Sequence, residues 1–353
     1  MHIFKARTPT YNDLFGVFLQ PDKWYLAETQ NATPAFMGQP SAIEARYPGV
    51  ELKPLKWEEM GFRTVPRYDN PKERVWVIRA GGYGDLFYLL PVLKVIASKL
   101  ECPAEQLILQ TAMEPFATTI PLQFRKFPSA LDEIDKDAAI LNMEDIPGEL
   151  EYEGAGSTAV RYARRAGLTE DDLDFDGLFP KELQERGERL WREWYGNKRP
   201  RVVIALTASA ATRSVPAALQ VALAIYQRAA IYFASNFAHP LPFPYSLKLK
   251  SDDWIGLVMA ADAVIGADTA PTHLAILLRK PTLAVFGAIP SKLRIPECLA
   301  DNVKVIDVDK TSTCPCKLNR PFCPVTQQAI CFALASKTRE IIEIAMEFLS
   351  EIY

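Results

Sequence analysis

Residues 266–287, "GADTAPTHLAILLRKPTLAVFG", combine apolar flanks with a polar centre. The flanks are apolar enough for a buried strand, a helix and a second strand, the pattern of a βαβ unit. Between them, four polar side chains fall within six positions: Asp268, Thr269, Thr272 and His273. Parallel sheets bind ligands at the carboxyl ends of their strands, beside the helices that follow. The stretch therefore predicts a polar site at the edge of an α/β domain.

The same alternation begins well upstream of this stretch. "RVWVIR" (74–79) is a candidate buried strand, followed by a glycine turn, 80–85, and an apolar segment of helical length, 86–100. Two later apolar runs, 107–112 and 138–143, are further strand candidates. Strands that alternate with helices indicate a parallel sheet with helices packed on it.

A second series of the same kind starts at "RVVIAL" (201–206). Further strands are expected at 230–235 and 263–267, with helices at 216–229 and 252–262. Two such series in a chain of 353 residues predict two α/β domains, each large enough for its own core.

We expect four parts in the chain. Residues 1–70 are rich in proline and aromatic residues, which favours a small appendage with some β-strands. The first α/β domain then spans 71–198, and the second spans 199–335. An amphipathic helix over 336–353 closes the chain.

The composition is that of an ordinary globular protein, with 49% hydrophobic residues and a net charge of −3. No long basic run is present, which argues against nucleic acid as a partner. The N-terminus lacks a signal-peptide pattern, and no apolar run approaches the ~18 residues of a membrane span. We expect a soluble, cytoplasmic protein without a transmembrane segment, and peripheral association with a membrane surface stays open.

The glycine turn of the first series ends in an aspartate. Gly82, Tyr83 and Gly84 lead into Asp85, which lies where the next helix is expected to begin. Asp85 could cap that helix, or it could face a ligand and take up a proton; the residues alone favour neither role. The glycine spacing does not match the G-x-G-x-x-G fingerprint, so NAD is disfavoured as a cofactor.

The polar centre of the opening stretch precedes a helix whose first turn contains Pro271. The amides from Ala270 to His273, with the two threonine hydroxyls, would form an anion site suited to a diphosphate. Asp268 could cap the helix or accept a hydrogen bond from a sugar or ribose hydroxyl. The alternative is an ordinary helix cap with His273 packed in the core. The convergence of several polar residue types favours a functional site.

The polar turn "TASAATRS" follows the first strand of the second series. Arg213 could reach the same phosphates, with help from Thr207 and Ser209, because a guanidinium matches the oxygens of a diphosphate. Lys292 and Arg294 are weaker candidates for the same role.

Two stretches together resemble glycosyltransferase family 9, the ADP-heptose transferases: "VWVIRAGGYGDLFYLLPVL" (75–93) and "AADAVIGADTAPTHLAILLRKPTLAVFG" (260–287). The first carries the strand, small-residue turn, Gly-Asp and proline-bearing helix of that family. The second matches its Asp-Ser/Thr-Gly-x-x-His turn, followed by Lys/Arg-Pro and Phe-Gly. The resemblance covers residues 74–335, and Ala270 replaces the usual glycine of the second motif.

The resemblance implies a GT-B fold, in which an acceptor-binding and a donor-binding Rossmann-like domain face a cleft. It implies inverting transfer of a sugar from an ADP-sugar, with ADP-heptose the favoured donor. The acceptor is not carried over from the family, because residues 1–70 have no counterpart in the lipopolysaccharide-core enzymes; we expect a hydroxyl of a glycan or protein. No cofactor is implied for the chemistry. In that scheme Asp85 is the base and Gly82–Gly84 form the acceptor-side turn. Arg213 binds the phosphates, and residues 268–273 hold the nucleotide diphosphate and the sugar.

Four of the six cysteines, Cys314, Cys316, Cys323 and Cys331, fall within 18 residues. Four thiolates in one loop (314–331) could hold a tetrahedral Zn or Fe ion, whereas the alternative is reduced thiols that pack the loop. We favour a structural metal that takes no part in the chemistry. A cysteine-rich loop combined with extra N-terminal sequence is similar to the protein-modifying heptosyltransferases.

Two other functions remain as alternatives. A nucleotide-sugar epimerase on the same fold would turn over the donor without an acceptor, and it would need further acid–base residues near the donor sugar. A noncatalytic sugar-nucleotide-binding assembly subunit would work through its cysteine loop and its N-terminal appendage. The presence of Asp85 argues mildly against this second alternative.

Overall fold

The computed structural model divides the chain into two compact units. Unit 1 comprises 1–115, 120–149 and 162–174, and unit 2 comprises 116–119, 150–161 and 175–353. The structure describes residues 2–6, 10–12, 17–19, 23–27, 50–54, 57–64, 72–79, 82–126, 131–143, 156–208, 213–215, 218–225, 228–234, 244, 249–308 and 331–352.

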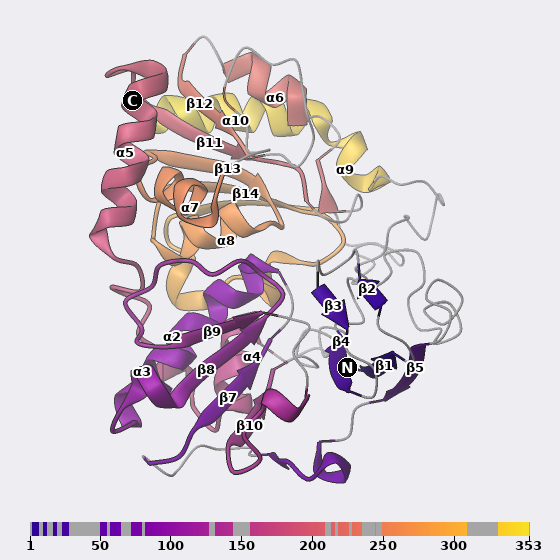
Figure 1. Ribbon diagram of the computed structural model, residues 1–353. Coiled ribbons are helices and arrows are strands. Elements are labelled where there is room, and N and C mark those ends of the chain that lie inside the picture. Colours follow the sequence, from indigo (N-terminus) through magenta and orange to yellow (C-terminus); the bar gives the residue numbers. More distant parts are fainter. Residues whose placement is uncertain are drawn as a thin grey trace. The chain divides into compact units, whose positions relative to one another are not determined.

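The centre of unit 1 is a parallel five-stranded sheet (Figure 1). Its strands, in spatial order, are β6 (Arg63–Thr64), β10 (Ala139–Asn142), β7 (Val75–Ile78), β8 (Leu107–Thr111) and β9 (Gln123–Lys126). Every residue of β7 and β8 is buried, as expected for central strands of a parallel sheet that is covered on both faces. The helices that accompany it are α2 (Tyr83–Lys99) and α3 (Pro103–Gln106), and α4 (Thr158–Arg165) belongs to unit 1 from Tyr162 onward.

One face of this sheet carries an aromatic cluster. Trp57 and Phe62, on either side of the short helix η1 (Glu58–Met60), pack in an edge-to-face arrangement with ring centroids 5.6 Å apart. They cover Trp76 of β7 and Ile108 of β8, which lie opposite each other in the sheet. The apolar alternation of the strands thus fixes which side chains face this cluster.

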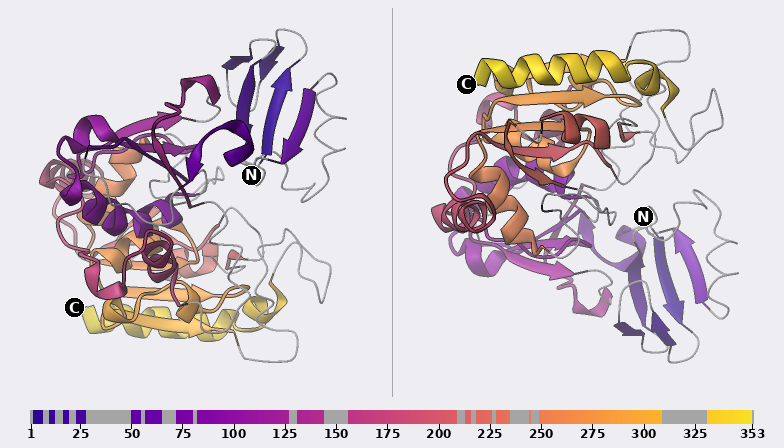
Figure 2. Two further views of the ribbon diagram at one scale, coloured as in Figure 1. Left: turned by 90° about the horizontal axis from the view of Figure 1, so that it is seen from below. Right: turned by 90° about the horizontal axis from the view of Figure 1, so that it is seen from above.

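The N-terminal strands form an antiparallel sheet of their own, drawn in indigo in Figure 2. β1 (His2–Ala6) lies between β4 (Trp24–Ala27) and β5 (Val50–Pro54). β2 (Thr10–Asn12) and β3 (Val17–Leu19) form a separate antiparallel pair. The β-rich appendage expected from the sequence is therefore present.

Unit 2 is built on a second parallel sheet of five strands. They are, in spatial order, β12 (Ala230–Phe233), β11 (Arg201–Ala205), β13 (Ala263–Ala267), β14 (Thr282–Phe286) and β15 (Val303–Asp307). Its helices are α5 (Lys181–Tyr195), α6 (Ala218–Ile225), α7 (Ser251–Met259), α8 (Ala270–Leu277), α9 (Phe332–Ser336) and α10 (Thr338–Ile352). Single-turn helices complete the element list: η2 (Leu131–Glu133) and η4 (Glu170–Asp172) in unit 1, with η6 (Ser291–Leu293) and η7 (Glu297–Leu299) in unit 2.

The main core of unit 2 lies between its sheet and the helices α6 and α10 (Figure 1). Ile204 and Ile265 point into it from the strands, and Val221 of α6 and Phe348 of α10 meet them. Residues of opposite parity in β13, such as Gly266, face α8 on the other side of the sheet. The C-terminal helix is thus part of this core rather than an addition to it.

The expected α/β fold with two Rossmann-like sheets is confirmed. The strand expected at 263–267 is β13, and the helix expected at 86–100 begins three residues earlier, at Tyr83. The division into units differs from the expected boundary near residue 198, because α5 groups with unit 2. Likewise, β6 joins the parallel sheet although it lies in the segment assigned to the appendage.

A close crossing of two helices explains why α5 groups with unit 2. Gly187 of α5 lies so near α7 that a Cβ on it would fall 1.9 Å from the carbonyl oxygen of Gly256. A Cβ on Gly256 would fall 2.3 Å from the carbonyl oxygen of Leu183. Trp191 secures the same contact by donating its indole N–H to the carbonyl oxygen of Leu257 at 3.1 Å. Only glycines allow the two backbones to approach this far.

We predict that Gly187→Ala destabilises unit 2, because the added methyl group must push α5 and α7 apart. Overpacking of this kind costs about 1–3 kcal/mol, which corresponds to a fall in Tm of about 2–8 °C in differential scanning calorimetry. Gln184→Ala, on the exposed side of α5, is the matched control and should leave Tm nearly unchanged. A Tm for Gly187→Ala equal to that of the control would contradict this packing.

Candidate functional site

Unit 2 places Asp268 directly after its central strand. β13 ends at Ala267, and α8 begins at Ala270, so Asp268 lies at the carboxyl edge of the sheet. Thr269 has extended backbone angles, φ −148° and ψ 163°, and is the N-cap residue of α8. Ligands of open parallel sheets bind at this edge.

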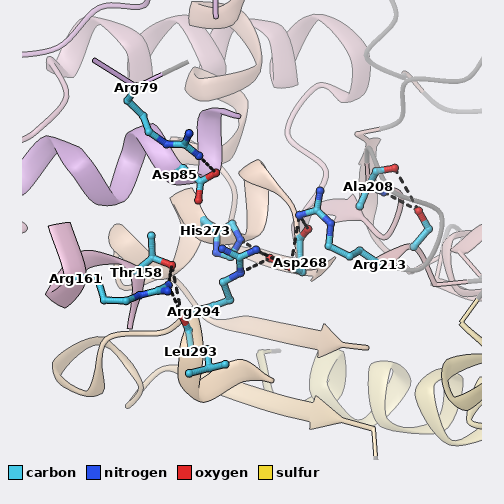
Figure 3. Close-up of polar contacts among 11 residues, drawn as sticks. Arg79, Asp85, Thr158, Arg161, Ala208, Arg213, Asp268, His273, Leu293 and Arg294 are labelled. Atoms are coloured by element: carbon cyan, nitrogen blue, oxygen red, sulfur yellow. Dashed lines mark hydrogen bonds and ion pairs between the residues drawn. The ribbon is translucent and has the colours of Figure 1, made fainter. Parts of the chain in front are cut away.

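Three side chains from different elements converge on Asp268 (Figure 3). His273 of α8 places Nε2 2.8 Å from Oδ1 of Asp268. Arg294, just after η6, places Nε 3.3 Å from Oδ1 and Nη2 3.4 Å from Oδ2. Arg213, in the turn after β11, donates from Nη1 to the Asp268 carbonyl oxygen at 3.1 Å and lies 3.5 Å from Oδ2. We call Asp268, His273, Arg213 and Arg294 the Asp268 cluster.

The Asp268 cluster holds its carboxylate in the ionised form. The side chain of Asp268 is only 1% exposed. Burial alone would raise the pKa of Asp268, but the charges of Arg294 and Arg213 and the hydrogen bond from His273 hold that pKa well below the usual range of a carboxyl group. Because an ionised carboxylate only accepts hydrogen bonds, Nε2 of His273 carries the proton in this contact.

The turn that carries Arg294 is fixed by two further contacts. Asp307, the last residue of β15, accepts hydrogen bonds from the Ser291 amide at 3.0 Å and from the Ser291 hydroxyl at 2.6 Å. On the other side of η6, the Leu293 carbonyl oxygen lies 3.4 Å from both the Thr158 hydroxyl and Nη2 of Arg161. The backbone beside Arg294 is therefore held from both ends of η6.

The start of α8 differs from the expected anion site. The amides of Thr272 and His273 both donate to the Thr269 carbonyl oxygen at 3.1 Å. Thr272 has no exposed surface, and an added Cβ on Gly266 would fall 1.9 Å from its hydroxyl oxygen. Thr272 thus packs into the sheet, and we leave it out of the proposed ligand contacts. Thr269 and Ala270 are partly exposed.

Of the three residues expected to bind phosphate in the turn after β11, the structure describes Thr207 and Arg213. The Thr207 hydroxyl lies 3.3 Å from the Ala234 carbonyl oxygen, so it bonds to the end of the neighbouring strand β12. Ser214, beside Arg213, accepts a hydrogen bond from the Ala208 amide at 2.9 Å. Ser209 lies outside the described residues. Arg213 is therefore the member of this turn that joins the Asp268 cluster.

Unit 1 has its own carboxylate at the carboxyl edge of a central strand. Asp85 lies in the first turn of α2, and Gly82 is the N-cap residue of that helix. Nη2 of Arg79, the residue after β7, donates to Oδ2 of Asp85 at 2.7 Å (Figure 3). Nε of the same guanidinium donates to the Tyr162 hydroxyl at 2.8 Å. Arg79 is 1% exposed whereas Asp85 is 22% exposed, so the carboxylate is the accessible part of this ion pair.

The remaining residues of the expected acceptor-side turn line the start of α2. The Tyr83 hydroxyl donates to the Glu114 carbonyl oxygen at 3.2 Å, and the Tyr83 ring stacks on Phe87. Gly82 is exposed, and Gly84 lies in the first turn of α2. Gly82 has φ −62°, so it is not required there by a left-handed backbone.

The expected metal site lies largely outside the described residues. Cys314, Cys316 and Cys323 belong to that part of the chain. Cys331 is the N-cap residue of α9 and is 8% exposed, within the core cluster of unit 2. Within the described ranges, no group of three His, Cys, Asp or Glu residues is arranged to hold a metal ion.

Comparison with known proteins finds similarity to one family over the segment that carries most of this site. Residues 248–320, which include Asp268, His273 and Arg294, match the model of glycosyltransferase family 9 (heptosyltransferase). A stretch of 67 residues is 36% identical to lipopolysaccharide heptosyltransferase 1 of Campylobacter coli. That match spans 19% of this chain and 19% of the relative's length.

Solved structures agree at the level of the fold. A glycosyltransferase family 9 protein from Veillonella parvula has a TM-score of 0.51 at 10% identity, over 81% of this chain and 99% of its own. The dodecameric iron-containing heptosyltransferase TibC of E. coli H10407, solved with ADP-D-beta-D-heptose, has a TM-score of 0.53 at 12% identity. This second likeness covers 100% of this chain and 91% of the other. The resemblance to glycosyltransferase family 9 is confirmed.

The structure adds residues that the family motifs alone did not single out. Arg79 and Tyr162 are 83 residues apart in sequence, and only the fold joins them at Asp85. A usable signal was present for Arg79, since a charged residue that ends a buried strand needs a partner. Arg294 carried a weaker signal, a basic residue shortly after the Phe-Gly of the second family-9 motif. As to membranes, none of the helices in the described parts of the chain is long and apolar enough to cross a bilayer.

We predict that Asp268→Asn lowers the free energy of unfolding at pH 7 by about 3–5 kcal/mol, because two arginines lose their buried counter-charge. The difference from wild type should shrink as the pH falls below about 4, by up to ~1.4 kcal/mol per pH unit. In the unfolded wild type Asp268 takes up a proton near pH 4, whereas in the folded state it stays ionised, so wild-type stability falls with pH and the asparagine variant lacks this term.

Urea unfolding at pH 7, 4 and 3 measures this difference, and all other carboxyl groups titrate alike in the two proteins. A gap between wild type and variant that stays constant from pH 7 to pH 3 would show that Asp268 is not held in its ionised form.

Proposed function

We propose that the protein is an inverting glycosyltransferase that transfers a sugar to a hydroxyl of a glycan or protein. The favoured donor is ADP-heptose, from which heptose would be transferred. The observation that carries the proposal is that the family-9 match, 248–320, falls on the segment that builds most of the Asp268 cluster. The cluster provides fixed positive charge at the carboxyl edge of a parallel sheet, where sugar nucleotides bind in such folds.

On the donor side, the cationic groups of Arg213 and Arg294 suit the diphosphate of a sugar nucleotide. As the bond between the anomeric carbon and the diphosphate breaks, negative charge grows on the leaving oxygen. Preorganised cations at that point stabilise the transition state more than the bound substrate. Thr269 and Ala270, which are partly exposed beside Asp268, would contact the donor from the start of α8.

On the acceptor side, Asp85 would act as the general base. Its carboxylate takes the proton of the acceptor hydroxyl while the oxygen forms a bond to the anomeric carbon and ADP departs with the electrons of the broken bond. Attack from the face opposite the leaving group inverts the configuration. Arg79 holds one carboxylate oxygen at 2.7 Å, which fixes the orientation of the carboxylate.

We also propose that Cys314, Cys316, Cys323 and Cys331 hold a structural Zn or Fe ion beside unit 2. The clustered cysteines support this assignment, and the solved heptosyltransferase TibC is iron-containing. The ion would hold the chain between β15 and α9, and the transfer reaction would proceed without it at the reacting atoms.

We predict that Asp85→Asn lowers the rate of sugar transfer by about 10²–10⁴-fold, the contribution of a general base, while leaving nucleotide affinity unchanged. Transfer is measured with radiolabelled ADP-heptose and a panel of glycan and protein acceptors. Asp137→Asn, an exposed aspartate elsewhere in unit 1, is the matched control and should transfer at the wild-type rate.

Nucleotide binding is followed by thermal shift with ADP, UDP, GDP and CMP. A ligand present at ~100 times its Kd adds about 2.7 kcal/mol of stability, and we expect ADP to stabilise the wild type and Asp85→Asn equally. Transfer by Asp85→Asn at the wild-type rate would exclude Asp85 as the general base. Stabilisation by UDP or GDP instead of ADP would be consistent with a glycosyltransferase but would exclude ADP-heptose as its donor. Donor turnover in the absence of any acceptor would indicate an epimerase instead.

We predict about one equivalent of Zn or Fe per chain in protein purified without oxygen, and a loss of that metal in Cys316→Ser. Elemental analysis measures both. Fewer than ~0.2 equivalents in the wild type would leave the cysteines as packing residues.

A further inference from the structure

The amino edge of the second sheet carries a buried arginine that the proposed reaction does not use. Arg201 is the first residue of β11, and it is 4% exposed. Among the described residues, neither Nε nor Nη1 of its guanidinium has a hydrogen-bond partner. A buried charge without a partner is costly, and most buried polar groups in proteins are hydrogen-bonded. The contacts of the described chain therefore leave this guanidinium incomplete.

The carboxylate at the same edge, Asp262, does not complete it. Asp262 directly precedes β13, which lies beside β11 in the sheet. Its Oδ1 pairs with Nη1 of Arg199, and its Oδ2 accepts a hydrogen bond from the backbone amide of Arg201 at 2.7 Å. The contact of Asp262 with Arg201 is thus made to the main chain and not to the guanidinium.

Further cations act on Arg201. Burial lowers the pKa of Arg201, and the charges of Arg199 and Arg192 lower it further, whereas those of Glu188 and Asp262 raise it. The guanidinium therefore lies in a place that would be more favourable with an additional negative charge.

Lys280 adds another cation at this edge. It lies two residues before β14, and its Nζ donates to the Ala261 carbonyl oxygen at 2.9 Å. Burial lowers the pKa of Lys280, and the charges of Asp262 and Arg199 act on it as they do on Arg201. Together with the groups around Arg201, Lys280 makes four cations against two carboxylates, so two positive charges are in excess. This excess matches a phosphate group, which carries a charge of about −1.5 to −2 at pH 7.

We propose that Arg201 is the ligand of a phosphate-binding site at the amino edge of the second sheet. The site would take a phosphate ion or the phosphate group of a larger molecule, because the planar guanidinium suits the oxygens of either. It is separate from the proposed donor site at the carboxyl edge, since β11 and β13 have five residues each and span about 16 Å. The proposal does not depend on the proposed function.

The ion pair next to Arg201 borders solvent. The side chain of Arg199 is 52% exposed, and that of Asp262 is 28% exposed. In the proposal an anion approaches from this side, and the Arg199 side chain shifts to admit it. Arg199 then adds its charge to the site, while Arg201 supplies the hydrogen bonds.

The test measures the Tm of the full-length protein by differential scanning calorimetry. Inorganic phosphate and methyl phosphate are each titrated against sodium chloride at equal ionic strength. The variants are Arg201→Met, Arg201→Lys and Glu188→Gln. Arg339→Gln is the matched control, because it removes an exposed guanidinium from α10 of the same unit. The readout is the part of the shift that depends on Arg201, so phosphate bound elsewhere cancels between the variants.

We expect phosphate at ~10 times its Kd to raise the Tm of the wild type and of Arg339→Gln by about 3–6 °C. The rise should disappear in Arg201→Met and be smaller in Arg201→Lys, which keeps the charge but lacks the planar fork. Glu188→Gln should bind phosphate about 2–5-fold more tightly, because a negative charge near the guanidinium is removed. In chloride alone, Arg201→Met should melt no lower than the wild type, since it removes a buried charge that no described group pairs.

Equal stabilisation by methyl phosphate would assign the site to a phosphate ester, and a response to inorganic phosphate alone would assign it to the free ion. A lower Tm of both Arg201→Met and Glu188→Gln in chloride, without a phosphate effect that depends on Arg201, would show that these two residues pair in solution and would overturn the proposal. If the Arg201 variants fail to fold, Glu188→Gln decides, because a phosphate affinity equal to that of the wild type would also overturn it.

Discussion

A carboxylate cannot be buried without compensation, and the burial of Asp268 shapes the whole carboxyl edge of the second sheet. The compensation comes from α8, from the turn after β11 and from the turn after η6, which supply His273, Arg213 and Arg294. These segments are connected through different strands, so their meeting point is set by sheet order and strand register. Displacement of any one of them removes a charge or hydrogen-bond partner from the buried carboxylate. This edge of the sheet therefore folds correctly only when its cationic side chains are correctly placed.

Each unit contains an ion pair between an aspartate and an arginine, but the two carboxylates differ in solvent exposure. In each, an aspartate follows a central strand and meets an arginine: Asp85 with Arg79, and Asp268 with Arg294. In unit 1 the arginine is the buried partner and the carboxylate is 22% exposed; in unit 2 the carboxylate is buried at 1%. An exposed carboxylate can exchange a proton with a ligand, whereas an enclosed one serves as a fixed charge. In the proposed function, the same pair of residue types would support acid–base chemistry in unit 1 and would provide a fixed charge in unit 2.

Local features of this site could be predicted from the sequence because they depend on neighbours in the chain. The apolar run of β13 and the proline at the start of α8 located Asp268 and His273 correctly. Contacts between distant segments could not be predicted in this way: Asp268 and Arg294 are 26 residues apart, and nothing in either segment states which residue the other one meets. The packing of Thr272 could not be predicted for a related reason, since its hydroxyl lies against Gly266, although a glycine in a buried strand is itself a sign of such a close approach. The edge strands β9 and β15 are partly exposed, so they lack the continuous apolar runs that revealed the central strands.

The way unit 2 is spread along the chain has a consequence for how the protein is made. Thr158 and Arg161 leave the ribosome 135 and 132 residues before Leu293, whose carbonyl oxygen they contact. At the other extreme, α10 contributes to the core of unit 2 from more than 130 residues after the start of β11. Domains generally fold in the order in which they emerge, yet here the second unit cannot close its core until α10 has emerged. Until then, the part of the apolar face of β11 and β13 that α10 covers in the folded unit stays open, although the segments that carry Arg213, His273 and Arg294 have already been made.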